Sequence, residues 1–276
     1  MTALVAWLGV DNHPPRNPPA SLYLASDSRI SWDDSLRQTW DSGRKVFAVR
    51  EGTDLFGYCG DVLFPSLVLG QIVEMIDDGV LYSQGDAPTE RSERVRRTLE
   101  VGFRAFPRNR FAPGTKILYC CRWGQFMQST FHAFSLSPGP DGTWTSSGLP
   151  LPSGSGIIAA YGSGRRAVCA AADRWNRAGG DAQTSRYIFG AFCEAIASGS
   201  DGHSGGPPQL VGLYRKGPSR NFGVIVGRQR YLFGLPVEAL PLGSRITWHD
   251  TLLQRCDPET LDLLPRAQRH ARPRNA

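Results

Sequence analysis

The order of apolar patterns along the chain constrains its fold more than any other feature. Short runs with the apolar content of strands come in three groups, and two pairs of helix-like patterns separate these groups. Because a helix or a sheet buries one face against another element, this order predicts a layered α+β chain in which two sheets lie between helical layers. Strands are expected over residues 2–10, 20–28, 43–49, 54–60, 115–123, 128–136, 156–162, 209–215, 221–227 and 229–234, and helices over 61–78, 89–106, 165–178 and 183–198.

The first expected strand, residues 2–10, is apolar along its whole length, as is typical of a strand covered on both faces. A Pro-rich loop at 11–19 links it to the second strand, and a short hairpin arm is expected near 36–40. The stretch that precedes residue 155 is rich in Gly, Pro and Ser, which predicts a loop.

The chain has 276 residues, which is enough for one large domain or two small ones. It has no apolar run near the roughly 20 residues of a membrane helix, and its N-terminus lacks the pattern of a secretory signal. We therefore expect a cytoplasmic protein without membrane contact. Residues 2–234 are expected to form the main domain. Residues 235–276 are interrupted by prolines and predict an appendage with one helix and a basic, flexible tail.

Neither the cysteines nor the basic residues indicate a cofactor or a nucleic acid. The six cysteines show no CxxC spacing and no Cys/His pairing, so no metal and no cofactor is expected. Basic and aromatic residues are not interleaved as in RNA-binding proteins. Only three of the 31 basic residues, Lys45, Lys116 and Lys216, are lysines. Lysine can lose its proton when buried and arginine cannot, so a lysine kept in this background suggests a chemical role.

Thr2, directly behind the initiator methionine, is a candidate nucleophile. A threonine at a free N-terminus carries its own base, the α-amine, and needs no histidine. Methionine before a small residue is normally removed, so Thr2 is expected to become the first residue without a propeptide.

Six short motifs occur in the order found in one known family. With them, the chain resembles the β-type subunits of the proteasome and their simpler bacterial relatives, in the N-terminal nucleophile hydrolase superfamily, over about residues 2–234. The resemblance implies a four-layer αββα sandwich. The motifs are Thr2, LASDSR (24–29), RKVFA (44–48), GYCGD (57–61), YGSG (161–164) and DGHSGG (201–206).

The resemblance implies a catalytic role for Thr2, Asp27 and Lys45. Thr2 Oγ would attack the scissile carbonyl while its own α-amine carries the proton. Lys45, held near Asp27, would favour deprotonation of the hydroxyl, because a nearby ammonium stabilises an anion. The alternative is a surface ion pair worth about 0–1 kcal/mol. Both residues sit in strongly apolar strands, which favours the catalytic role.

The resemblance also assigns the groups around the nucleophile. Gly60 would offer its backbone N–H to the oxyanion, and Ser163, Asp201 and Ser204 would orient the Thr2 amine. Taken alone, these residues have structural explanations. Gly60 can be a strand-ending glycine, Ser163 a helix cap, and the 201–206 segment a tight turn.

Ser31, Tyr58 and Val62 are expected to bind substrate. Tyr58 and Val62 flank the Gly60 turn, and two bulky groups there predict a pocket that prefers small side chains. Arg29 is expected to be a structural partner of the site.

The predicted function is that of a threonine-type endopeptidase, which hydrolyses peptide bonds through Thr2 by way of an acyl ester. Expected partners are a peptide or unfolded-protein substrate, further copies of the chain in a homo-oligomeric ring or spiral, and an ATP-dependent unfoldase. No nucleic acid is expected as a partner.

Three other interpretations were open. Residues 202–207 resemble the G-D-S-G-G-P motif of trypsin-like proteases, but no histidine and aspartate occur in the required setting and four helices interrupt the chain. An N-terminal nucleophile amidase acting on small amides would share the fold. A non-catalytic structural subunit of a proteasome-like assembly is disfavoured, because no catalytic position is missing.

Overall fold

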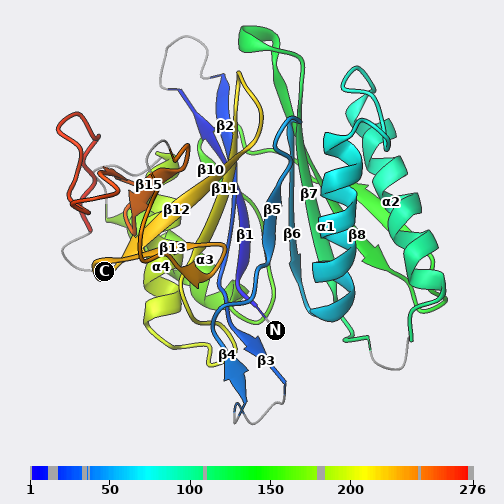
Figure 1. The fold of residues 1–276 in the computed structure, drawn as a ribbon, viewed down its shortest axis with the longest axis horizontal. Helices are drawn as coiled ribbons and strands as arrows, with labels where there is room; N and C mark the ends of the chain where they lie inside the picture. The colour runs from blue at the N-terminus through cyan, green and yellow to red at the C-terminus, as the bar shows by residue number, and fades with distance from the viewer. Residues whose placement is uncertain are drawn as a thin grey trace.

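The computed structural model describes residues 2–11, 18–32, 36, 38–107, 111–178, 184–241 and 244–272. Its elements are mixed helices and sheets, which confirms the expected class. Figure 1 shows the two larger sheets side by side, with helices on their outer sides.

Nine strands of the described chain form the larger sheet. Strand β1 (Leu4–Val10) lies inside it, antiparallel to both β10 (Gly156–Tyr161) and β2 (Pro19–Ser26). On the other edge of β2 comes β11 (Gln209–Tyr214), followed by β12 (Arg220–Val226). The sheet is completed by β13 (Gln229–Leu232), β14 (Leu235–Pro236), β15 (Thr247–Asp250) and β16 (Arg255–Cys256).

A five-stranded antiparallel sheet faces the first. Its strands, in spatial order, are β5 (Val46–Ala48), β6 (Asp54–Cys59), β7 (Lys116–Trp123), β8 (Thr130–Pro138) and β9 (Trp144–Gly148). A separate hairpin of β3 (Ile30–Ser31) and β4 (Thr39–Trp40) projects from the bottom of the molecule in Figure 1.

Alternation along β1 explains why this strand is apolar throughout. Leu4, Ala6 and Leu8 belong to a buried cluster that joins the two sheets through residues such as Leu55 and Leu118. The intervening Ala3, Val5 and Trp7 belong to a different cluster on the other face of the sheet. The strand is therefore covered on both sides, as its sequence predicts.

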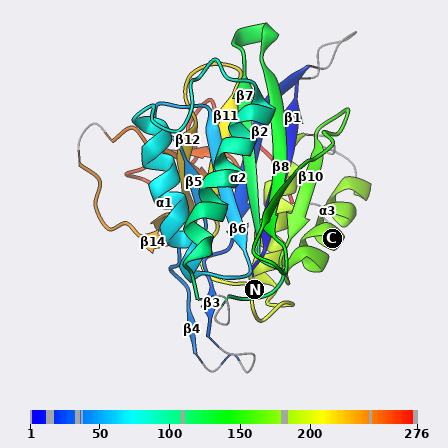
Figure 2. The same ribbon diagram turned by 90° about the vertical axis from the view of Figure 1, so that its right-hand side faces the viewer.

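Two helices cover the outer face of each sheet. Helices α3 (Arg165–Arg177) and α4 (Ser185–Ala197) bury apolar residues against the β1 sheet. Helices α1 (Leu63–Asp77) and α2 (Pro88–Arg104) pack on the five-stranded sheet and lie over it in Figure 2. None of the described helices is long and apolar enough to cross a membrane.

Local sequence signals mark the starts of helices α1 and α2. The Asp61 carboxylate accepts a hydrogen bond from the Phe64 amide (3.0 Å), which satisfies a free donor at the start of α1. Helix α2 begins with Pro88 in its first turn, and the Glu90 carboxylate accepts a hydrogen bond from the Ala87 amide (3.1 Å).

Within residues 2–234, each expected strand and helix has a counterpart in the structure, but strand β9 was missed. The Gly-, Pro- and Ser-rich stretch contains β9, which pairs with β8. Trp144 holds this edge strand in the buried cluster between the five-stranded sheet and helices α1 and α2 (the helix-side core). Most other residues of β9 are at least partly exposed and polar. Its composition therefore resembles that of a loop.

The C-terminal segment differs from the expectation. The predicted helix is absent from the described residues 235–241 and 244–272. Strand β15 instead pairs in parallel with β12, and Trp248 is buried there. Residues 12–17, 37, 183, 242–243 and 273–276, which belong to predicted segments, lie outside the described residues.

Candidate active site

The site begins at the end of the larger sheet where β1 starts and β2 ends. Leu4 lies opposite Ser26 in the register of these strands, so Thr2 and Ala3 reach Asp27. The Asp27 amide donates to the Ala3 carbonyl oxygen (3.2 Å), and the Ala3 amide donates to Asp27 Oδ1 (3.0 Å). Thr2 itself is buried.

Lys45 lies just before β5 of the five-stranded sheet, and its side chain reaches Asp27 at the end of the larger sheet. Its ammonium lies 2.9 Å from Asp27 Oδ1, and both side chains are 0% exposed. The ammonium also donates to the Arg29 carbonyl oxygen. Lys45 Nζ and the Ala3 amide contact the same carboxylate oxygen, so the ammonium lies close to the backbone that carries Thr2. This burial excludes a surface ion pair.

Burial also changes the proton affinity of Lys45. Removal from water disfavours the charged form and lowers the pKa of Lys45, and the Asp27 carboxylate opposes this shift without cancelling it. The other carboxylate oxygen of Asp27 accepts hydrogen bonds from the Arg29 amide (3.1 Å) and the Gly205 amide (3.0 Å). Asp27 thus accepts four hydrogen bonds and holds Lys45 in place.

A second network surrounds the Thr2 nitrogen. The Thr2 N–H donates to Ser163 Oγ (3.3 Å), and the Ser163 hydroxyl donates to Asp201 Oδ2 (2.7 Å). Ser204 donates to the same oxygen, also at 2.7 Å. Burial alone would raise the pKa of Asp201, but the hydrogen bonds from Ser204 and Ser163 outweigh it and hold the pKa below its ordinary value. A charged carboxylate therefore orders both hydroxyls.

Glycines allow these segments to approach β1. Gly162 has a φ of +86°, and a Cβ there would lie 1.9 Å from the Thr2 carbonyl oxygen. The Gly164 amide donates to that same oxygen (3.1 Å). The Gly-Ser-Gly sequence is thus required by the close contact between the start of α3 and Thr2.

Arg29 links the turns of the site. Its guanidinium forms two hydrogen bonds with Asp41 (2.7 and 2.8 Å) and one with the Gly202 carbonyl oxygen (3.0 Å). A Cβ at Gly205 would lie 2.5 Å from the guanidinium carbon of Arg29. The contacts are those of a structural partner, which is the role we expect for Arg29.

Gly60 ends β6 in a conformation that favours glycine. Its φ is +93°, and a Cβ there would lie 2.6 Å from Thr115 Cα. The Asp61 amide donates to Thr115 Oγ1 (2.7 Å), which holds the turn. Two residues earlier, the Tyr58 amide donates to the Lys45 carbonyl oxygen (3.2 Å), so the Gly60 turn follows directly on the contact with Lys45.

The three expected substrate-binding residues are placed differently from one another. Tyr58 is buried in the helix-side core, and its hydroxyl donates to the Arg44 carbonyl oxygen (2.9 Å). The Tyr58 ring packs on the side of the sheet that α1 and α2 cover, and its contact with substrate stays a prediction. Val62 is half-buried just before α1. Ser31 lies on β3, and its Oγ is buried without a hydrogen-bond partner among the described residues.

Gln209 is a site residue that sequence reasoning missed. It is buried, its Oε1 accepts from the Lys45 amide (3.0 Å), and its Nε2 donates to Ser28 Oγ (2.8 Å) and to the Gly43 carbonyl oxygen (2.6 Å). It therefore fixes the backbone on both sides of the Asp27–Lys45 pair. A glutamine at the start of a strand has no spacing signal that distinguishes it.

Within the described residues, no group of three or more His, Cys, Asp or Glu side chains could hold a metal ion. The chemistry available to the site is that of a hydroxyl, a backbone nitrogen, an ammonium and two carboxylates.

Comparison with known proteins finds similarity at the level of structure alone. No family model and no curated protein matches the chain. It is similar to the solved structure of an Anbu mutant from Hyphomicrobium sp. strain MC1, at 14% identity, 80% coverage of this chain and 86% of that chain, and a TM-score of 0.48. It is also similar to HslV from Trypanosoma brucei, at 15% identity, 76% and 99% coverage, and a TM-score of 0.45.

A third similar structure is that of Thiobacillus denitrificans BPH in complex with epoxomicin, at 17% identity, 79% coverage of this chain and 100% of that chain, and a TM-score of 0.49. All three are proteasome-like N-terminal nucleophile hydrolases, the group that the sequence motifs resemble.

Proposed function

We propose that the chain is a threonine-type endopeptidase with the four-layer αββα sandwich of an N-terminal nucleophile hydrolase. One observation carries the proposal. The Thr2 nitrogen is hydrogen-bonded to the Ser163–Asp201–Ser204 network, while the next residue shares a carboxylate oxygen with the wholly buried Lys45. These two arrangements meet at adjacent residues, Thr2 and Ala3.

Removal of Met1 converts the Thr2 nitrogen into an α-amine. An ordinary α-amine has a pKa of about 7.7–8.0, so a substantial neutral fraction exists near pH 7 and can accept a proton. The amine takes the Thr2 hydroxyl proton as Oγ attacks the substrate carbonyl carbon. The Lys45 ammonium, buried and away from water, stabilises the developing negative charge on Oγ.

The hydrogen-bond network sets the direction of the amine. The single proton of the Ser163 hydroxyl goes to Asp201, so Ser163 Oγ can only accept from the Thr2 nitrogen. One N–H of the amine is thereby held toward Ser163, and its lone pair is left to face the Thr2 hydroxyl.

Gly60 is proposed to bind the oxyanion. Alternate residues of a strand direct their N–H groups to the same edge, and the Tyr58 N–H points to Lys45. The Gly60 N–H would then point to the same edge of the strand as the Tyr58 N–H, two residues further along the chain and past Lys45. Loss of one such donor typically costs about 10²–10³ in rate.

The reaction then passes through an ester. Collapse of the tetrahedral intermediate breaks the peptide bond, and the protonated Thr2 amine gives its proton to the leaving amine. A water molecule attacks the ester carbonyl, again with the Thr2 amine as base, and the carboxylic acid product leaves with Thr2 Oγ restored.

The substrate contacts that we propose are Ser31, Tyr58 and Val62. The Ser31 hydroxyl has no partner among the described residues, so it can bind a polar group of an extended peptide. We propose a peptide substrate and assembly into a homo-oligomeric ring or spiral, with an ATP-dependent unfoldase as a partner, on the sequence resemblance alone.

Two substitutions at one position test the proposal. Thr2→Ala should abolish cleavage of fluorogenic peptides, and Thr2→Ser should keep measurable cleavage because it retains the hydroxyl and the amine. A mass spectrum of each variant must show that Met1 has been removed. Full activity of the Thr2→Ala variant would overturn the proposal, and cleavage of small amides in place of peptides would move it to an amidase.

A further inference from the structure

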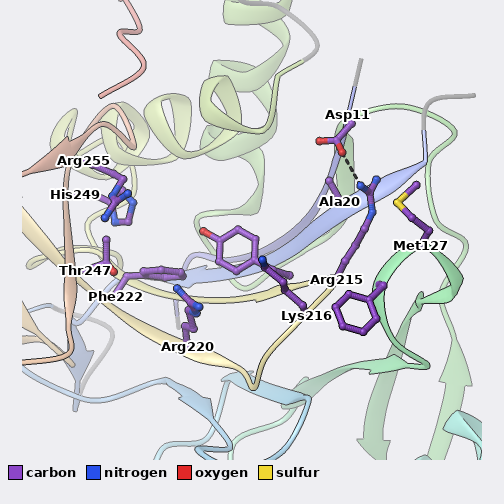
Figure 3. A pocket seen from close by; sticks show the side chains of 12 residues that line it. Asp11, Ala20, Met127, Arg215, Lys216, Arg220, Phe222, Thr247, His249 and Arg255 are labelled. Carbon is purple, nitrogen blue, oxygen red and sulfur yellow. Dashed lines mark hydrogen bonds and ion pairs between the residues drawn. The ribbon is translucent and has the colours of Figure 1, made fainter. Parts of the chain in front are cut away.

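A cavity of about 620 Å³ lies at the opposite end of β1 from Thr2. Figure 3 shows its lining, which comes mainly from β11, β12, β15 and the neighbouring turns. Thr2 and Asp11 lie nine residues apart on an extended strand, which corresponds to roughly 30 Å. A second cavity of about 740 Å³ adjoins it and shares His249 and Arg255. This region is therefore separate from the candidate active site.

Positive charge is in excess in the cavity. Lys216, Arg220 and Arg255 line it, and none of the three forms a salt bridge with a carboxylate in the described part of the chain. Arg215 differs from them, because it is bound to Asp11 (2.6 Å) and to two backbone carbonyl oxygens. The dashed line in Figure 3 marks the Asp11–Arg215 pair. Three cations thus remain to attract an anion.

A buried polar group also faces this region without a partner. His249 is 6% exposed, and its Nδ1 has no hydrogen-bond partner among the described residues. Burial, assisted by Arg255, lowers the pKa of His249 to about 4, so the ring is neutral near pH 7. A neutral imidazole offers a hydrogen bond and no charge, which suits an uncharged polar group of a ligand.

Aromatic rings supply flat apolar surface beside the cations. The rings of Tyr214 and Phe222 meet edge to face at 6.3 Å, and the Arg220 guanidinium lies 5.5 Å from the Tyr214 ring centre. Phe126 is 62% exposed in η2 (Phe126–Gln128), and its φ is +53°, a strained conformation for a bulky residue. A hydrogen bond from its amide to the Arg215 carbonyl oxygen (3.0 Å) holds it at the rim.

We propose that this cavity binds a small polyanion that carries a flat ring, which is the chemistry of a nucleoside polyphosphate. The volume is within the range of small-molecule sites, about 300–1,000 Å³. The unpaired cations would bind the phosphates, and the rings of Tyr214 and Phe126 would pack against the base. The site does not depend on the proposed peptidase activity.

Isothermal titration of the full chain with metal-free ATP at low salt tests the proposal. We expect one ATP per chain, weaker binding of tripolyphosphate, which lacks the ring, and still weaker binding of adenosine, which lacks the charge. Replacing both Arg220 and Arg255 by glutamine should weaken ATP binding by at least about 10-fold, because two charge-assisted contacts are lost. The matched control is Arg104→Gln, an exposed arginine on α2 that should leave the affinity unchanged.

A further variant separates binding of the base from binding of the phosphates. Phe126→Asn should weaken binding of ATP and leave tripolyphosphate unaffected, and asparagine tolerates the positive φ. Melting curves and far-ultraviolet circular dichroism establish that each variant is folded. Absence of ATP binding, equal affinity of the wild type and the double variant, or equal affinity for ATP and tripolyphosphate would each overturn the proposal.

Discussion

The described part of the molecule has two buried ion pairs, one in each half, and they differ in their cation. One pair uses the ammonium of a lysine and the other the guanidinium of an arginine. Lys45 and Asp27 lie at the start of β1, with both side chains 0% exposed. Arg91 and Asp54 lie between α2 and the five-stranded sheet, with side chains 1% and 0% exposed and 3.6 Å between Arg91 Nη1 and Asp54 Oδ1. Burial alone therefore does not mark an active site.

The neighbours of each cation show the difference. Arg91 donates to backbone carbonyl oxygens of Asp86 (3.0 Å) and Gln84, so its guanidinium ties a loop to the sheet. Asp54 accepts from the Tyr119 hydroxyl (2.7 Å), and burial raises its pKa although Tyr119 and Arg91 oppose the shift. Lys45 carries a compact charge of lowered pKa and shares a carboxylate oxygen with the Ala3 amide, next to the proposed nucleophile Thr2. A guanidinium stays charged and can bridge several fixed acceptors, which suits a structural role. A buried ammonium can lose its proton, which suits proton transfer.

Among the variants that test this comparison, Lys45→Arg should have the largest effect on kcat/KM. A guanidinium is too large for a fully buried ammonium site and cannot match its compact charge, so kcat/KM for a fluorogenic peptide should fall by about 10³-fold. The reciprocal Arg91→Lys should leave kcat/KM of the folded protein within about threefold, since Arg91 lies outside the proposed mechanism. A Lys45→Arg enzyme with near wild-type activity would remove the distinction between the two pairs.

Arg91→Met should act on stability and not on catalysis. It leaves the buried Asp54 carboxylate without its cation, which costs about 3–5 kcal/mol. Urea unfolding measures the change, and Arg97→Met, at an exposed arginine of the same helix, should stay within about 0.5 kcal/mol. Equal stability of the two variants would show that the Asp54–Arg91 pair contributes no structural support.

Gln209→Leu should have a smaller effect on rate. It removes the acceptor of the Lys45 amide and leaves Ser28 Oγ and the Gly43 carbonyl oxygen without a donor, so kcat should fall by about 10-fold while KM stays nearly constant. Gln254→Leu, at another buried glutamine, should lower the melting temperature and leave kcat unchanged. A change in melting temperature alone for Gln209→Leu would reduce Gln209 to a structural role.

The smallest expected effect is a pH dependence at Asp201. The folded state lowers the pKa of Asp201 below its ordinary value near 3.8, so this group adds stability above that pH and loses it as pH falls through the folded pKa. Asp201→Asn should therefore melt at a lower temperature than the wild type at pH 7, and the difference should shrink below about pH 4. A difference that is constant between pH 7 and pH 3 would contradict this assignment.

Sequence patterns predicted most of the fold because periodicity reports directly on burial. The apolar β1 and the four helices follow from it, whereas β9 does not, since its Ser and Thr residues cover an edge and only Trp144 enters the core. Strand β15 escaped prediction for another reason. Its pairing with β12 is a long-range contact behind a Pro-rich segment, and no local pattern indicates it.

The candidate site was predictable only where several motifs occurred in a known order. Asp27 and Lys45 are far apart in sequence and meet beside Ala3, the neighbour of Thr2, as Ser163 and Asp201 meet beside the Thr2 nitrogen. Neighbouring residues of a strand face opposite sides, so Cys59 faces the inter-sheet cluster and Tyr58 the helix-side core, a placement that the motif itself does not give. Gln209 was missed because its role lies in backbone contacts that no motif describes.

The intact mass of the purified protein, before and after treatment with a peptide epoxyketone, tests the central claim most directly. This reagent reacts with both the hydroxyl and the α-amine of an N-terminal threonine. We expect loss of Met1 and one stoichiometric adduct per chain, which is absent from the Thr2→Ala variant. A chain that keeps Met1 and forms no adduct would contradict the claim that Thr2 is a free and activated nucleophile.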